Sequence, residues 1–116
     1  MAKLLRLAEY RRSQRVITFD RHEMNLLLAL YSRRVAMGEW RDYAIDLDGG
    51  MAAFSVFRHS DDRPLFTIAK CAGSPADGPG GRGYILFNGA QILRRGRDIR
   101  DVLSAFEPPL RLVGRA

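Results

Sequence analysis

The chain has 116 residues, a formal net charge of +6, 47% hydrophobic residues and 28% charged residues. This size and composition are typical of one globular domain and exclude a chain that is disordered throughout. The apolar runs are too short to span a bilayer, and Arg6 and Glu9 interrupt the N-terminal apolar stretch that a secretory signal needs, so we expect a cytoplasmic protein with no membrane partner.

The positive charge is concentrated at the two ends of the chain. Residues 1–15 contain five basic residues and one acidic residue, and residues 82–116 contain seven and three, whereas residues 16–81 contain seven and nine. We therefore divide the chain into a basic N-terminal arm at residues 1–15, expected to be flexible, one domain at residues 16–107, and a tail at residues 108–116. Cys71 is the single cysteine, so no internal disulfide can form.

The first predicted elements are a short strand at residues 16–19 and a long helix that ends near Met37. Asp20 stands at the N-cap position and Glu23 follows three residues later, which is the spacing of a capping box. Gly38 can adopt the left-handed conformation that ends a helix. Apolar residues recur at helical spacing and predict the buried face: Met24, Leu26, Leu27, Leu28, Leu30, Tyr31 and Val35.

Alternation of apolar and polar residues predicts strands after this helix. Tyr43, Ile45 and Leu47 form one face of the first strand, and Asp42, Ala44, Asp46 and Asp48 form the other. A hairpin loop at residues 49–50 predicts that the next strand places its apolar residues opposite those of the first, in the pairs Leu47 with Ala52, Ile45 with Phe54, and Tyr43 with Val56.

The remaining segments complete an α+β fold. A third strand is predicted at residues 65–70, followed by a flexible Gly/Pro-rich loop at residues 71–83 and a hairpin around Asn88-Gly89. Asp98 begins a short C-terminal helix that ends before residues 108–109, a Pro-Pro pair. We expect an antiparallel meander of four to five strands, packed on one long N-terminal helix and the short C-terminal helix.

Such a fold leaves one face of the sheet without a helix. We expect this uncovered face to be an interface, because aromatic residues are predicted to lie on it. In strand alternation Trp40 and Phe57 lie on the outer face, together with Phe66 or Ile68. The stretch "GEWRDYAID" at residues 38–46 is interpreted mainly as a structural joint, in which Arg41 and Asp42 bond to backbone or to neighbouring charges. The candidate interface residues are Trp40, Asp42, Phe57 and Arg58.

The sequence contains no pattern that is typical of a catalytic, cofactor or metal site. The three aspartates of the first strand are interpreted as a solvated face, and His22, His59 and Cys71 lack a zinc spacing. The stretch "GPGGRG" lacks the ending of a phosphate-binding loop. We therefore expect no enzyme activity, no cofactor and no small-molecule substrate.

Clusters of arginine raise nucleic-acid binding as an alternative, because arginine binds phosphate groups in bidentate geometry. The candidate phosphate-contacting residues lie near both ends of the chain: Arg6, Arg11, Arg12, Arg15, Arg94, Arg95 and Arg97.

Three stretches carry a family resemblance: "FDRHEMNLLLALYSRRVAMGEWRDYAID", "FSVFRHSDDRPLFTIAK" and "ILRRGRDIRDVL". With them the chain resembles an uncharacterised alphaproteobacterial family, domain of unknown function 2794, over most of residues 16–103. The loop "CAGSPADGPGGRG" is richer in glycine and proline than this family leads us to expect. The resemblance implies a bacterial cytoplasmic setting and no activity. The leading hypothesis is a non-enzymatic binding or adaptor domain that engages a protein partner or a second copy of itself.

Overall fold

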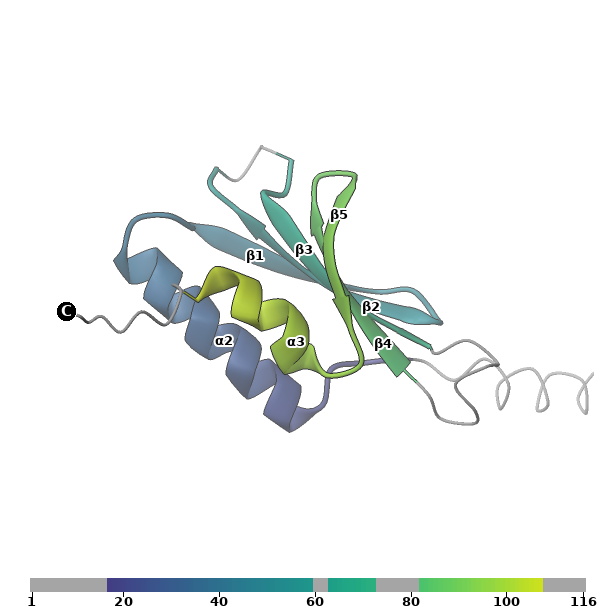
Figure 1. The fold of residues 1–116 in the computed structure, drawn as a ribbon. Helices are drawn as coiled ribbons and strands as arrows, with labels where there is room; N and C mark the ends of the chain where they lie inside the picture. Colours follow the sequence, from purple (N-terminus) through teal and green to yellow (C-terminus); the bar gives the residue numbers. More distant parts are fainter. Residues whose placement is uncertain (1–16, 60–62, 73–81, 108–116) are drawn as a thin grey trace, which may run out of the picture.

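The computed structural model describes residues 17–59, 63–72 and 82–107, and it confirms the α+β class. Five strands form one antiparallel sheet in the order of the sequence, so β1 and β5 are its edges. Both helices lie on the same face of this sheet (Figure 1). The elements are α2 (Arg21–Ala36), β1 (Asp42–Leu47), β2 (Met51–Phe57), β3 (Phe66–Ala72), β4 (Arg82–Asn88), β5 (Gln91–Gly96), α3 (Ile99–Leu103) and the 3-10 helix η2 (Ser104–Phe106).

Helix α2 begins and ends where the sequence predicts. The Asp20 side chain accepts a hydrogen bond from the Glu23 backbone N–H at 2.8 Å, and the Glu23 carboxylate accepts one from the Asp20 N–H at 2.8 Å. These reciprocal bonds satisfy two N–H groups that a helix start leaves without partners. Gly38 has a φ of 79°, and its N–H donates to the carbonyl of Val35. The helix therefore stops at the position predicted from Gly38.

The first hairpin has the predicted register. Leu47 pairs with Ala52, Ile45 with Phe54, and Tyr43 with Val56. Gly49, with a φ of 58°, is the first of two loop residues. The second hairpin differs by one residue from the prediction: Asn88 pairs with Gln91, so the loop is residues 89–90. Only Gly89 has a positive φ there, which excludes the type I′ turn that Asn88-Gly89 indicates.

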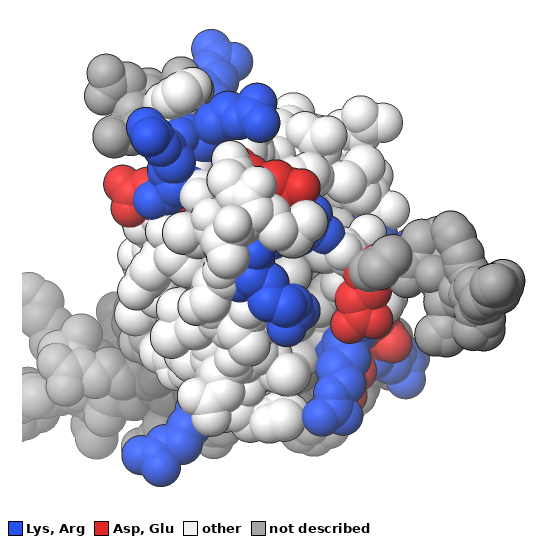
Figure 2. Space-filling view, turned by 90° about the vertical axis from the view of Figure 1, so that its left-hand side faces the viewer, with Lys and Arg blue, Asp and Glu red and all other residues white. Residues whose placement is uncertain are grey.

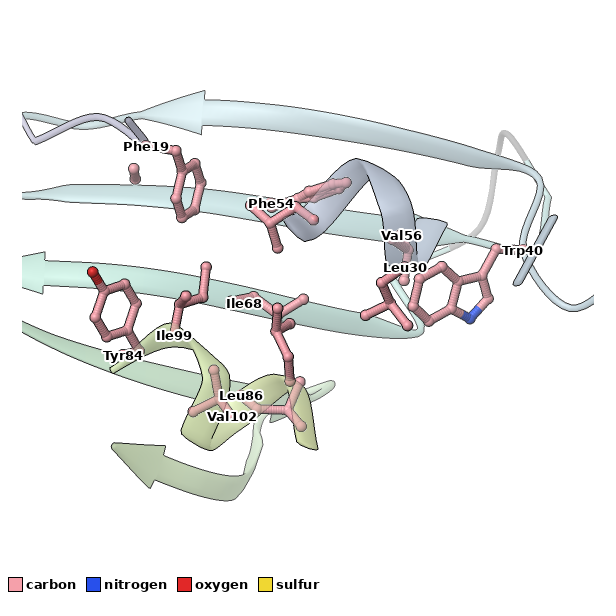
Figure 3. Packing of buried hydrophobic residues seen from close by; sticks show 13 residues of the cluster. Phe19, Leu30, Trp40, Phe54, Val56, Ile68, Tyr84, Leu86, Ile99 and Val102 are labelled. Carbon is pink, nitrogen blue, oxygen red and sulfur yellow. The ribbon is translucent and has the colours of Figure 1, made fainter. Parts of the chain in front are cut away.

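The core lies between the sheet and the two helices (Figure 3). The central strands contribute side chains that are almost inaccessible to solvent, because they are covered by helix on one side and flanked by strands on both edges. Leu27 and Leu30 of α2 and Val102 of α3 complete this layer. The most deeply buried large side chains are Phe54, Leu27, Ile68, Leu86, Val56 and Val102.

An ion pair is buried at the start of α2. The Lys70 Nζ atom donates to Glu23 Oε1 at 2.7 Å and to the Thr18 carbonyl at 2.8 Å, and the Tyr84 hydroxyl donates to Glu23 Oε2. The Glu23 and Lys70 side chains are only 5% and 6% exposed. The capping glutamate thus also joins the helix to β3 and β4, and burial of both charges is tolerated because each makes several hydrogen bonds.

Several sequence-based expectations were wrong. Residue 16 lies outside the described residues, and residues 17–20 form no strand, because the Ile17 N–H makes a single backbone bond to the Gly49 carbonyl instead of a ladder. Strand β3 extends to Ala72 and β4 begins at Arg82, so the predicted loop at residues 71–83 is shorter at both ends. Its predicted flexibility concerns residues 73–81, which lie outside the described residues. The whole predicted N-terminal arm at residues 1–15 and the tail at residues 108–116 also lie outside them.

Of the large apolar residues expected on the outer face, Trp40, Phe66 and Ile68 lie on the helix-covered side instead, and only Phe57 lies where it was expected. Trp40 is 4% exposed and Ile68 is 1% exposed, and both belong to the core. Strand β1 begins only at Asp42, so strand alternation does not extend back to Trp40. Ile68 pairs with Phe54, and Phe66 pairs with Val56, so they share the inner face with these residues.

Candidate interaction surface

Residues 39–40, within the stretch interpreted as a structural joint, join the end of α2 to the 3-10 helix η2. The Arg34 guanidinium lies 5.9 Å from the centre of the Trp40 ring and 5.7 Å from that of Phe106. Its Nη1 atom is bonded to the Glu39 carboxylate, and its Nη2 atom donates to the Phe106 carbonyl. Arg34 therefore connects the end of α2, the bend before β1 and the 3-10 helix η2. In Figure 3 the Trp40 ring faces Leu30 and Val56.

An exposed apolar strip lies on the inner face of β1 and is not predicted by the strand alternation, which assigns its residues to the core. Tyr43, Ile45 and Leu47 are 39%, 40% and 53% exposed, although they lie on the face that carries the helices. The Tyr31 ring of α2 contacts Tyr43, with ring centres 4.9 Å apart. Val35, one helical turn after Tyr31, is itself 40% exposed. We call Val35, Tyr43, Ile45 and Leu47 the β1 strip.

The free edge of β1 borders this strip. Among the described residues, β2 is the only strand that pairs with β1. Asp48 and Met51 exchange two backbone hydrogen bonds across the hairpin, so the even-numbered residues of β1 bond to β2. The N–H and C=O groups of Tyr43, Ile45 and Leu47 therefore point to the free edge. An edge of this kind can accept a further strand.

The outer face of the sheet carries small buried residues and acidic residues. Ala53, Ser55 and Ala69 are 8%, 7% and 1% exposed, although both helices lie on the opposite face. Phe57 lies on this outer face, opposite Asp42, and is half-buried. The following residue, Arg58, is exposed. Of the four candidate interface residues, Trp40 is thus buried in the core, whereas Asp42 and Phe57 lie on the outer face and Arg58 directly follows Phe57.

The acidic side chains of this face belong to β1. Asp42 and Asp46 are exposed and lie opposite Phe57 and Ala53, so neither has a basic residue across the ladder. The Asp42 carboxylate accepts a hydrogen bond from the Tyr43 N–H at 2.9 Å. A depression at the start of β1 is lined by Val35, Gly38, Trp40, Arg41 and Asp42. One end of the strip is thus hollowed and polar.

The described arginines among those proposed to contact phosphate do not gather on one face. Arg94 lies opposite Leu86 on the inner face and donates to the Ser104 hydroxyl at 2.6 Å, whereas Arg95 lies opposite Ile85 on the outer face. Arg97 is exposed in the segment before α3. Figure 2 shows Lys and Arg side chains at several separate places among uncharged areas on one side of the molecule. The other four arginines lie outside the described residues: Arg6, Arg11, Arg12 and Arg15.

Burial and hydrogen bonding shift the pKa values of Glu23 and Cys71 in opposite directions. Burial opposes ionisation of Glu23, but the hydrogen bonds from Lys70, Tyr84 and the Asp20 backbone outweigh it and lower the pKa of this carboxyl below its ordinary value. Burial raises the pKa of the Cys71 thiol. Both oxygens of the Glu23 carboxylate accept hydrogen bonds from within the protein. We therefore assign Glu23, Lys70 and Tyr84 a structural role, which is to join α2 to β3 and β4.

The described ranges contain neither a cluster of potential metal ligands nor a helix that could span a membrane. No group of three or more His, Cys, Asp or Glu side chains there is placed to hold a metal ion. In the same ranges no helix has the length and apolar content needed to cross a membrane.

Residues 17–103 match the model of a family described as "Protein of unknown function (DUF2794)". The chain belongs to this family. The match covers all five strands, α2 and α3, so the fold described above is that of the family region. Neither the curated proteins nor the solved structures gave a match to the chain.

Proposed function

We propose that this family member is a non-enzymatic protein-binding domain, and that the β1 strip is its contact surface. The observation that carries the proposal is the exposure of Tyr43, Ile45 and Leu47 beside the edge of β1 that faces away from β2, with which no described strand pairs. Apolar side chains on a free edge are an aggregation hazard unless something covers them. The outer face supports the proposal less, because its central residues Ala53 and Ala69 are already buried.

Nucleic-acid binding remains the alternative. The described arginines favour it less than protein binding, because Arg94 and Arg95 lie on opposite faces of the sheet and Arg94 is bonded to Ser104. Binding of random DNA and RNA at low and at raised salt tests it, since affinity that depends on phosphate contacts falls steeply with salt.

The test of protein binding compares two charged substitutions at equally exposed apolar positions on opposite edges of the sheet. Ile45→Lys lies in the β1 strip, and Leu93→Lys lies on β5, where the side chain is 45% exposed. The purified full chains are immobilised and exposed to a lysate of the cells that encode the protein, after circular dichroism shows that both are folded.

We expect the immobilised wild type and Leu93→Lys to retain one or more proteins from the lysate that Ile45→Lys does not retain. If retained proteins are the same for all three chains, the β1 strip is not the contact surface. Association of wild-type copies with one another, abolished by Ile45→Lys, would identify the partner as a second copy of the chain.

A further inference from the structure

The charge pattern of β1 restricts which strand can pair with its free edge. The two faces of β1 differ in chemistry: Tyr43, Ile45 and Leu47 project to the inner face, and Asp42 and Asp46 project to the outer face, with Asp48 just beyond. An added strand keeps the same face alternation as its neighbour, because successive side chains point to opposite sides. It therefore brings one set of residues beside the apolar strip and the other beside the aspartates.

A second copy of β1 is a poor occupant of this edge. Two β1 strands can pair antiparallel and symmetrically in two registers that align five residues of each strand. In both registers the apolar faces lie on one side of the sheet and the acidic faces on the other. One places Asp42 directly opposite Asp46, and the other places Asp42 opposite Asp48. Like charges directly opposite each other destabilise a strand pair. Within the described residues neither Asp42 nor Asp46 forms an ion pair that would compensate this repulsion.

We propose that β1 binds an extended segment of another protein whose residues alternate between basic and apolar, as a sixth strand of the sheet. The inference rests on the proposed function and adds the chemistry of the partner. Apolar side chains of the segment cover Tyr43, Ile45 and Leu47, and its basic side chains lie beside Asp42 and Asp46. Main-chain hydrogen bonds supply affinity and alternate side chains supply specificity in this mode of recognition.

The backbone geometry specifies which amides of the segment take part. The groups that point to the free edge belong to Tyr43, Ile45 and Leu47, and of these the Tyr43 N–H donates to the Asp42 carboxylate, a bond that an added strand replaces. In an antiparallel pair, residues with such groups exchange both hydrogen bonds with the residues directly opposite, which here are the apolar residues of the segment. In a parallel pair the bonds go to the residues on either side of the opposite one, which are the basic residues. In either orientation, only every second backbone amide of the segment bonds to β1, and the amides between them point away from the sheet.

The test uses the full chain and a fluorescent seven-residue peptide, Lys-Val-Lys-Val-Lys-Val-Lys, with both ends blocked. Fluorescence anisotropy measures its affinity beside a peptide with glutamate in place of lysine and one with serine in place of valine. Two further versions carry N-methyl groups, either on the valines or on the lysines, which remove one set of amide donors while keeping every side chain.

We expect the lysine-valine peptide to bind and both composition controls to bind at least tenfold more weakly. Only one of the two N-methylated peptides should lose binding: loss with methylated valine indicates an antiparallel strand, and loss with methylated lysine indicates a parallel one. The double substitution Asp42→Asn and Asp46→Asn should weaken binding about twofold to thirtyfold, since two exposed charge pairs together contribute ~0.4–2 kcal/mol and every ~1.4 kcal/mol is tenfold.

The inference is overturned if the lysine-valine peptide does not bind at millimolar concentration, if the glutamate peptide binds equally well, or if both or neither of the methylated peptides bind. If the peptides do not bind but Ile45→Lys still fails to retain a protein that the wild type retains, only this inference is wrong and the proposed function stands. If Ile45→Lys retains every protein and the peptides also fail, both proposals are wrong.

Discussion

One side chain at the start of α2, that of Glu23, connects three elements of the fold. Glu23 completes the capping box through Oε1 and accepts from Lys70 and Tyr84, so one carboxylate connects a helix terminus to two strands. The cost of burying its charge is offset only while all donors are in place. Loss of one partner leaves a charge in the core without compensation.

Removal of the buried cation should therefore be strongly destabilising. We expect Lys70→Met to lower the free energy of unfolding by about 3–5 kcal/mol, because Glu23 would keep its charge in a buried position without its partner. Urea denaturation followed by circular dichroism measures the loss. Arg95→Met, an exposed arginine on the same sheet, is the control and should change stability by less than about 0.5 kcal/mol. Equal effects of the two substitutions would contradict a stabilising ion pair.

The same carboxylate predicts a pH dependence. Because the folded state lowers the pKa of Glu23, its stabilisation is present above the unfolded-state pKa of about 4.3 and is lost as the pH falls through the lower folded-state pKa. We expect the stability difference between wild type and Glu23→Gln to be largest near neutral pH and to shrink below about pH 4.3. Denaturation series at several pH values test this, and a difference that grows with acidification would refute the assigned direction.

At the scale of elements, α2 covers the centre of the sheet but not its edge. Leu27 is 1% exposed over the central strands, whereas Val35 on the same helix is 40% exposed beside β1. Leu27→Ala should lower the free energy of unfolding by about 2–5 kcal/mol, as expected for a truncated core leucine. Val35→Ala is the matched control on the same helix and should cost much less. Comparable losses measured by urea denaturation would show that the two positions are equally packed.

The junction between β5 and α3 depends on the absence of a side chain. A Cβ atom added at Gly96 would lie far inside van der Waals contact with the Asp101 side chain, which caps α3. Gly96→Ala should destabilise the domain by about 1–3 kcal/mol by displacing this cap. Gly83 on the neighbouring strand is the control, because a Cβ atom there meets only the Gly96 carbonyl, at an ordinary 3.8 Å. A thermal melt in which Gly83→Ala is the more damaging variant would contradict this packing.

At the scale of the whole molecule, the meander has a protected centre and a free edge at β1. Amide protons in β2, β3 and β4 should exchange most slowly, because these strands are paired on both sides. Within β1 we expect Asp46 to be protected and Ile45 to exchange rapidly, since only the even-numbered residues bond to β2. Nuclear magnetic resonance of the free protein measures each amide. Protection of Ile45 in the absence of any partner would show that the edge is already paired.

Local patterns determined much of the fold from the sequence. Asp20 with Glu23, Gly38, and the two-residue alternation around Gly49 act through neighbouring backbone, so the helix bounds and the first hairpin register could be predicted. The family region likewise follows from ordered stretches of sequence.

The tertiary structure alone decided the rest, because it depends on which distant residues meet. Trp40 is buried through contacts with Phe66 and Phe106, which are remote in sequence. Lys70 finds Glu23 across 47 positions of the chain, and no periodicity indicates that pairing. The β1 strip is exposed because α2 lies over the sheet centre, so an apolar strand face that alternation assigns to the core is left in part open to solvent.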